Sequence, residues 1–314
     1  MTDSVSTIAK NQSTLVQYFE VWNLDDDGNS MSLQDYTRLR NDGVDSGKHG
    51  VDSGKLGRRV RCGEGVAGMA WNQRNAIILQ EAPSELLQRI GTQNGLQLTA
   101  LIAYPILRGQ EVLSVIVLGI SEGPGAFEVW GRDDRDELSI SASYYSRLKN
   151  LEFISRYVKF PKGAGLPGTV WKSGHPRLAP NLSSNPTFMR SWDADETHLS
   201  TGLCLPVGSA AGNSDSVLLL LSTSEKPIAT GFEIWAPKPD GELESQLQTV
   251  ASDRGPVCDE ETQIQLRIHD TVHAAWKTGR AMSSTQTEST YRQAMLAVPV
   301  YRGREQVSVV MFMF

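Results

Sequence analysis

The sequence has 314 residues, of which 39% are hydrophobic and 21% charged, and its formal net charge is −6. This composition is typical of a water-soluble globular protein, and the length predicts two or three domains. An acidic chain without a clustered basic face argues against nucleic acid as a partner. We expect no membrane contact, because the longest apolar run, residues 112–120, is far shorter than a bilayer span.

The cysteines and the first residues of the chain bear on its compartment. Cys62, Cys204 and Cys258 are odd in number and far apart in the sequence. They predict reduced thiols and a cytoplasmic location rather than a disulfide framework. Residues 1–17 have no basic segment followed by an apolar run, so we expect no signal peptide.

Three copies of one short strand open three similar stretches of the chain. They read Phe-Glu-Val-Trp at residues 19–22, Phe-Glu-Val-Trp at 127–130 and Phe-Glu-Ile-Trp at 232–235, and an acidic turn follows each. The glutamate alternates with apolar neighbours, so its side chain points away from theirs. We therefore expect these strands to lie near a sheet edge or beside solvent.

A glycine turn leading into an apolar helix comes next. It reads Gly-Glu-Gly-Val-Ala-Gly at residues 63–68 and Gly-Ala-Gly-Leu-Pro-Gly at 163–168, and a worn copy at 268–279 keeps a Trp and a Lys-x-Gly. A dinucleotide site requires this pattern inside a βαβ unit. Here the neighbouring strands indicate an antiparallel meander, which favours a tight strand-to-helix turn that needs positive φ.

Two more strands complete each stretch, one centred on a proline and one almost wholly apolar. The prolines are Pro105, Pro206 and Pro299, and every landmark recurs in unchanged order at a period of about one hundred residues. The final strands lack alternation, which is typical of strands buried on both faces. The uncovered back of each sheet must then pack against another repeat or against a partner chain.

The links between repeats are short and rich in turn formers. Such links predict β-hairpins that pair the last strand of one repeat with the first strand of the next. By the same reasoning, the first strand of the chain is expected to pair with the last and close the array. Residues 43–48 are repeated almost at once as residues 50–55, which predicts a surface loop.

The middle repeat resembles a GAF domain along its whole length, through residues 160–174, Asn181-Leu182, 188–190 and 202–207. The resemblance implies an α+β fold of three GAF-like repeats, each an antiparallel sheet with helices on one face, joined by tight β-hairpins. The expected domains are residues 1–122 (divergent, with a loop insertion at 42–57), 123–225 (the best match) and 226–314 (degenerate). The flanking helices usual in the family have no room here.

The resemblance also implies where a ligand would lie. GAF domains bind small molecules or act as dimerising relays, and the middle repeat offers aromatic walls with a few polar groups, as small-molecule pockets require. The alternative is that the tryptophans are ordinary core and that the arginine pairs with a carboxylate. The candidate ligand-binding residues are Trp171, Arg190, Trp192, His198 and Cys204.

A weaker candidate is the pair His269 and His273, which stand at i and i+4 and share a face if the segment is helical. The sequence offers no third metal ligand, so no metal, no other cofactor and no catalytic residue is expected. The leading prediction is a non-enzymatic sensory or regulatory module that binds a small ligand or a partner protein. The alternative is an assembly scaffold without a pocket, and a homo-oligomer is compatible with both.

Overall fold

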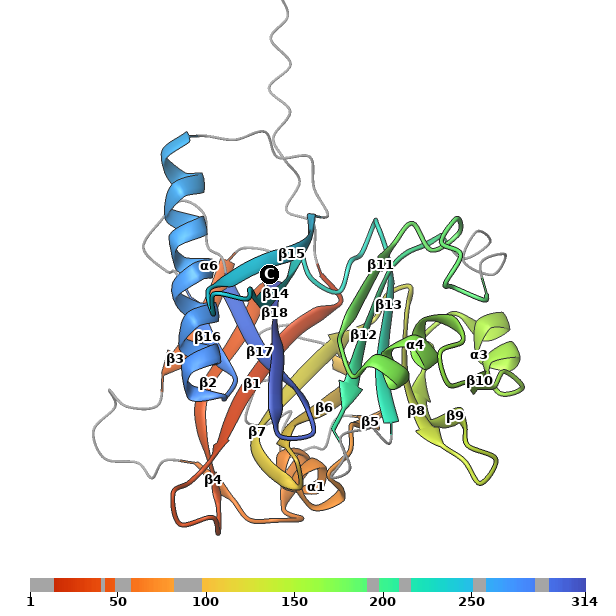
Figure 1. Ribbon diagram of the computed structural model, residues 1–314, viewed down its shortest axis with the longest axis horizontal. Helices are drawn as coiled ribbons and strands as arrows, with labels where there is room; N and C mark the ends of the chain where they lie inside the picture. Colours follow the sequence, from red (N-terminus) through yellow and green to blue (C-terminus); the bar gives the residue numbers. More distant parts are fainter. Residues whose placement is uncertain are drawn as a thin grey trace, which may run out of the picture.

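The computed structural model of the chain describes residues 14–40, 43–48, 58–81, 98–190, 198–208, 216–250, 258–285 and 294–314. The strands form three separate antiparallel sheets, each built from one contiguous part of the chain (Figure 1). Helices lie on the outer side of each sheet, so the expected α+β architecture is confirmed. No helix among these residues is long and apolar enough to cross a bilayer.

The first sheet has the strand order β3-β2-β1-β7-β6-β5, with β4 beside β2. Helix α1 packs on β6 and β7. The elements of this repeat are β1 (Val16–Leu24), β2 (Met31–Arg40), β3 (Gly43–Lys48), β4 (Arg59–Val60), α1 (Gly65–Gln73), β5 (Ile77–Leu79), β6 (Leu98–Arg108) and β7 (Glu111–Ser121).

The second sheet has the order β10-β9-β8-β13-β12-β11, and α4 packs on β12 and β13. Its elements are β8 (Gly125–Arg132), β9 (Glu137–Tyr144), α3 (Lys149–Ser155), β10 (Phe160–Pro161), α4 (Gly165–Ser173), β11 (Arg177–Pro180), β12 (Leu199–Val207) and β13 (Ser216–Thr223).

The third sheet has the order β15-β14-β18-β17-β16, and α6 packs on β16, β17 and β18. The same order of five strands therefore occurs three times, from β2 to β5, from β9 to β11 and from β15 to β16. Its elements are β14 (Gly231–Pro237), β15 (Leu243–Val250), α6 (Cys258–Thr278), β16 (Met282–Thr285), β17 (Ala294–Arg302) and β18 (Glu305–Met313).

The expected hairpins between repeats are wrong. In each repeat the first strand pairs with the last strand of its own sheet, as β1 does with β7, β8 with β13 and β14 with β18. Each last strand is already paired on both sides, so the short link from β7 to β8 crosses from one sheet to another. The link is tight, because a Cβ on Gly125 would lie 2.5 Å from a Leu15 methyl group.

The expected pairing of the first strand with the last is also wrong, since β1 lies between β2 and β7 and β18 lies between β14 and β17. The two strands nevertheless come close through side chains. The rings of Phe19 and Phe314 stack with their centroids 5.5 Å apart. The tandem-repeated segment departs from its expected loop as well: its first copy forms β3 on the edge of the first sheet, and residues 50–55 lie outside the described residues.

The three sheets pack back to back, as one of the two alternatives predicted. The proline-centred strands β6, β12 and β17 contact one another. Tyr104 donates a hydrogen bond to the Pro206 carbonyl at 2.7 Å, and the Gly109 amide donates one to the Gly303 carbonyl at 2.6 Å. Equivalent positions on these strands fill one shared apolar core: Ile102, Tyr104 and Ile106; Leu203, Leu205 and Val207; Leu296, Val298 and Val300.

The glycine turns before α1 and α4 have the structural role that their spacing predicts. Gly63 and Gly163 have φ of +85° and +89°. A Cβ on Gly68 would lie 2.3 Å from a backbone carbonyl oxygen, and one on Gly168 would lie 2.4 Å from another. Only glycine allows this approach, so the turn sets where each helix meets its sheet.

Candidate functional site

The glutamate of each first strand is buried. These strands are expected near a sheet edge or beside solvent, and the second of these alternatives is wrong. The side chain points to the helix-bearing face and accepts a hydrogen bond from the indole of the tryptophan two residues later, at 2.7, 2.8 and 2.7 Å. The glutamates are 2%, 0% and 1% exposed. The three pairs are Glu20 with Trp22, Glu128 with Trp130 and Glu233 with Trp235.

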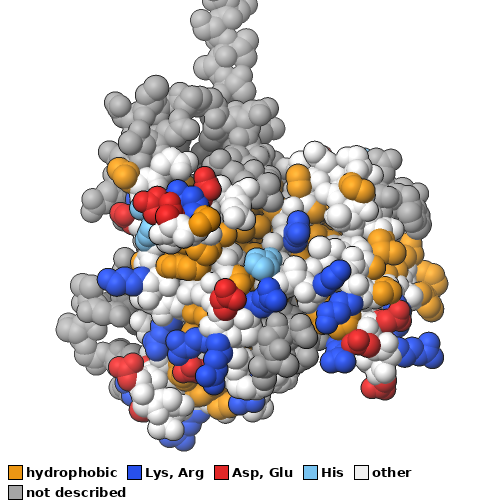
Figure 2. All heavy atoms as spheres, in the orientation of Figure 1, with side chains coloured by type: hydrophobic (Ala, Val, Ile, Leu, Met, Phe, Trp, Pro, Cys, Tyr) orange, Lys and Arg blue, Asp and Glu red, His pale blue; other side chains and the backbone are white. Residues whose placement is uncertain are grey.

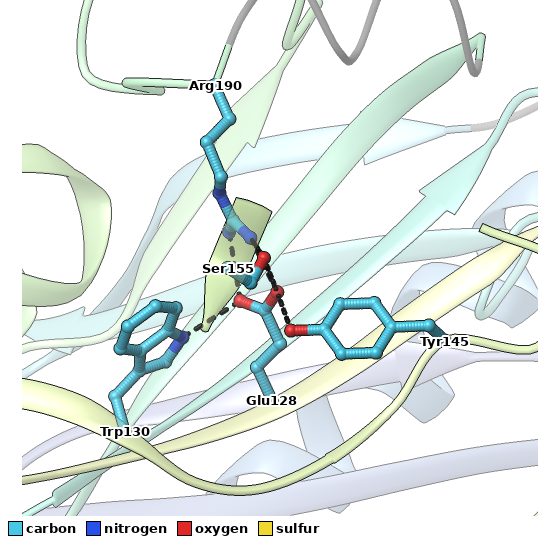
Figure 3. A network of polar contacts seen from close by, with 5 residues as sticks. All are labelled: Glu128, Trp130, Tyr145, Ser155 and Arg190. Atoms are coloured by element: carbon cyan, nitrogen blue, oxygen red, sulfur yellow. Dashed lines mark hydrogen bonds and ion pairs between the residues drawn. The ribbon is translucent and has the colours of Figure 1, made fainter. Parts of the chain in front are cut away.

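The middle repeat builds a polar network on this carboxylate (Figure 3). Arg190 donates two parallel hydrogen bonds to Glu128, from Nη1 to Oε1 at 2.6 Å and from Nη2 to Oε2 at 2.9 Å. Tyr145 and Ser155 donate to Oε1 at 2.9 and 3.2 Å, while the Trp130 indole donates to Oε2. Arg190 also donates to the Ser155 hydroxyl. Four side chains therefore hold the carboxylate in place.

These donors come from four parts of the repeat. Glu128 and Trp130 stand on β8, Tyr145 precedes α3, Ser155 is the last residue of α3, and Arg190 lies in the connection from β11 to β12. One carboxylate thus fastens a helix and a long connection to the sheet. A buried charge is tolerated only where its partners are this complete.

Burial and the nearby positive charge shift the pKa of the Glu128 carboxyl group in opposite directions. Burial raises the pKa of Glu128, but the Arg190 charge and the hydrogen bonds from Arg190, Tyr145 and Trp130 outweigh it and hold the pKa below its usual range. Burial and the Glu128 charge raise the pKa of the Tyr145 hydroxyl. The stable state is therefore a carboxylate facing a guanidinium, with a neutral phenol as donor.

Aromatic rings flank the guanidinium. Its Cζ lies 5.7 Å from the centre of the Trp130 ring and 5.2 Å from that of the Phe188 ring. Both distances are in the range of cation–π contacts, which gain strength when water is excluded. The Arg190 side chain is 3% exposed. The site is chemically a cation cradle made of a carboxylate and aromatic faces.

The structure places the candidate ligand-binding residues in different surroundings. Trp171 and Cys204 are buried in the apolar cluster that also contains Trp130 and Phe188, so they lie around the network. Burial, and after it the Glu128 charge, raises the pKa of the Cys204 thiol, which suits an inert core residue. His198 is exposed with φ of +56°. Trp192 lies outside the described residues.

His269 and His273 lie on one face of α6, as their spacing predicts. Their ring centroids are 4.0 Å apart, and the His269 and Trp235 rings form a T-shaped pair with centroids 6.2 Å apart. Burial and the neighbouring His269 lower the pKa of His273. Within the described part of the chain, no three His, Cys, Asp or Glu side chains are arranged to hold a metal ion.

An exposed apolar patch lies on the outer side of the middle repeat. Phe153 and Tyr157 are 62% and 73% exposed, and their rings pack edge to face with centroids 5.3 Å apart. Met189, next to the Arg190 of the network, is exposed as well. Figure 2 shows hydrophobic side chains gathered over α3 at the right-hand edge of the molecule. Ser155 of the network stands between the two aromatic residues in sequence.

A scan against protein-family models and a search of curated proteins gave no match. Among solved structures, the GAF domain of A. aeolicus nlh2 in an inactive state is 22% identical over 31% of this chain, with a TM-score of 0.26. The match spans 57% of that domain's chain. NreA from Staphylococcus aureus, mutated in its nitrate-binding site, is 21% identical over 33% of this chain and 78% of its own, with a TM-score of 0.27.

A wider but more distant likeness is to the sensor region of a sensor histidine kinase. It is 12% identical, covers 94% of this chain and 83% of that chain, and has a TM-score of 0.19. Several of the solved structures to which this chain is similar are GAF domains.

Proposed function

We propose that this chain is a non-enzymatic regulatory module and that the helix-bearing face of its middle repeat binds a small molecule or a partner protein. One observation carries the proposal: a single buried carboxylate, Glu128, fastens both α3 and the β11–β12 connection to the sheet. A group that engages this site changes how two covering segments are held. A regulatory module needs such coupling between a binding site and the segments that lie over it, here α3 and the β11–β12 connection.

The packing of the repeats supports the choice of face. The backs of the sheets are buried against one another in one core, so the outer faces remain for binding. The middle repeat adds the exposed Phe153 and Tyr157, and exposed apolar patches of this kind mark interaction sites. The free thiols Cys62 and Cys204 suit a reducing compartment such as the cytoplasm.

The alternative function is an assembly scaffold. This alternative is favoured because side chains of the chain itself fill the interior of the middle repeat. Trp171 and Cys204 are core residues, and Arg190 occupies the space in front of Glu128. In a scaffold the exposed Phe153 and Tyr157 would join copies of the chain. The two functions therefore differ in what contacts the middle repeat.

Two measurements separate them. A thermal-shift screen of nucleotides, amino acids, amines, guanidinium compounds and heme is expected to yield a ligand that raises the melting temperature by more than about 1 °C. That shift should disappear in a Glu128→Gln variant. Sedimentation of the wild type and of a Phe153→Ser/Tyr157→Ser variant tests the scaffold. No stabilising ligand, together with an oligomer that the double substitution dissociates, would replace the regulatory function with assembly.

A further inference from the structure

We infer that the interior of the middle repeat is a guanidinium-binding site that Arg190 occupies in cis, as a ligand tethered to the β11–β12 connection. The inference rests on the proposed function in taking this face of the repeat as its binding face. It adds the chemical class of the ligand, a small guanidinium compound.

Arg190 meets Glu128 with the geometry by which carboxylates recognise guanidinium groups. The two terminal nitrogens of Arg190 meet the two oxygens of Glu128 in parallel, at 2.6 and 2.9 Å. A planar fork matches a carboxylate in this way, whereas an ammonium group offers one point charge. The site is therefore shaped for guanidinium specifically.

Three side chains besides Arg190 also hold the carboxylate in place. Trp130 on β8, Tyr145 before α3 and Ser155 at the end of α3 each donate a hydrogen bond to Glu128. Removing the Arg190 side chain leaves these three donors, the carboxyl group and the aromatic rings. A preorganised cradle of this kind accepts an equivalent ligand with little reorganisation.

The pair of carboxylate and indole recurs in every repeat. Glu20 accepts from Trp22 at 2.7 Å and from the Tyr18 hydroxyl at 2.5 Å, and Glu233 accepts from Trp235 at 2.7 Å. The acidic, aromatic interior is thus present in all three repeats, although most other residues differ between them. In the middle repeat, the guanidinium that fills it comes from the chain itself.

The arrangement has a consequence for regulation. A free guanidinium compound that enters the cradle must displace Arg190, and the connection from β11 to β12 then loses its bonds to Glu128 and Ser155. Met189, which precedes Arg190 and is exposed, moves with it. Ligand entry is thereby transmitted to the outer surface of the repeat.

Chemical rescue tests the inference. An Arg190→Ala variant of the full chain is titrated with methylguanidinium chloride to about 20 mM while its melting temperature is recorded. We expect a rise of about 2 °C or more. Nonspecific denaturation at this concentration lowers the melting temperature by about half a degree or less, so the two effects have opposite signs. Wild type, an Arg190→Ala/Glu128→Gln variant, and equimolar sodium chloride or urea serve as controls.

Each outcome of the rescue experiment either supports or overturns the cis guanidinium site. A rise confined to Arg190→Ala supports the inference, and an equal rise in the double variant, or no rise, overturns it. If Arg190→Ala does not fold alone, its refolding yield with and without methylguanidinium is measured; recovery only with the compound supports the site, and no recovery overturns it. The proposed function is tested separately by the wild-type screen together with sedimentation. If no wild-type ligand is found and the Phe153→Ser/Tyr157→Ser variant dissociates an oligomer, the proposed function is rejected, and rescue of Arg190→Ala still keeps the cis site. A wild-type ligand without rescue keeps the proposed function and overturns the cis site.

Discussion

Tyr104 of the first repeat donates a hydrogen bond of 2.7 Å to the backbone carbonyl of Pro206 in the second repeat. The two residues lie on equivalent proline-centred strands, where the backs of the sheets meet. The bond is a buried polar link in a largely apolar interface. It ties the first two repeats into one packed body.

Replacing Tyr104 by Phe should therefore weaken the junction between repeats without disturbing either sheet. The ring stays, but the Pro206 carbonyl loses its buried donor, at a cost of about 1–3 kcal/mol. The free energy of unfolding from a urea titration measures the effect. Tyr157→Phe, in which the parent residue is 73% exposed, is the matched control and should change stability by less than about 0.5 kcal/mol. Equal effects would contradict the role of the interface bond.

A larger loss of stability is expected from a substitution in the glycine turn before α4. In Gly168→Ala the new Cβ would meet the Pro161 carbonyl oxygen at 2.4 Å, so the start of α4 must shift. We expect a loss of about 2–4 kcal/mol, within the range of severe backbone clashes. In Gly131→Ala the nearest atom lies at 3.5 Å, an ordinary contact, so this control should stay within about 1 kcal/mol of the wild type. Thermal unfolding of both variants checks the difference.

The pH dependence of stability follows from the lowered pKa of Glu128. Because the folded pKa lies below its ordinary value of 4.5, the unfolded chain binds a proton first as the pH falls. The contribution of Glu128 is thus fully present above about pH 4.5 and is lost as the pH falls through the folded pKa. A Glu128→Leu/Arg190→Met variant should lose stability less steeply in acid. Denaturant titrations between about pH 3 and 7 measure it, and parallel curves would contradict the assignment.

His273 gives a second, separate pH effect. Burial and His269 lower its pKa from 6.5, so the folded chain resists protonation of this imidazole. Its contribution to stability is therefore present above about pH 6.5 and is lost as the pH falls below it. Asp270 and Glu242 also act on the ring and oppose part of the shift. His273→Gln should flatten the dependence of the unfolding free energy on pH between about 5 and 7, and an unchanged dependence would contradict this assignment.

The repeat plan could be predicted from the sequence because its landmarks depend on local chemistry. Glycines at positive φ and apolar strands without alternation each fit few local structures, and both predictions are confirmed. The back-to-back packing followed from the same strands, since a bare apolar face needs cover. The links between repeats could not be predicted in this way: their length fits a hairpin, but length alone does not say whether the next strand stays in the same sheet.

Pairing of Arg190 with a carboxylate was one of the two alternatives for the middle repeat, and it is confirmed. Glu128 was not identified as that carboxylate, because alternation shows only that a side chain faces away from its neighbours. It does not show whether that face is exposed to solvent, so the strand was expected near a sheet edge or beside solvent. A signal was nevertheless present. The glutamate recurs in all three first strands, and an arginine stands before each proline-centred strand: Arg89, Arg190 and Arg292. Arg89 and Arg292 lie outside the described residues.

The most direct test of the account is a double-mutant cycle between Glu128 and Arg190, with the free energy of unfolding measured for the wild type, Glu128→Gln, Arg190→Met and the double variant. Each single substitution leaves a buried group without its partner, at a cost of about 3–5 kcal/mol. The account predicts that the double variant is clearly more stable than the sum of the two losses implies, by about 2 kcal/mol or more. Additive losses would show that the two side chains do not act as a pair, and they would contradict the proposed guanidinium-binding site.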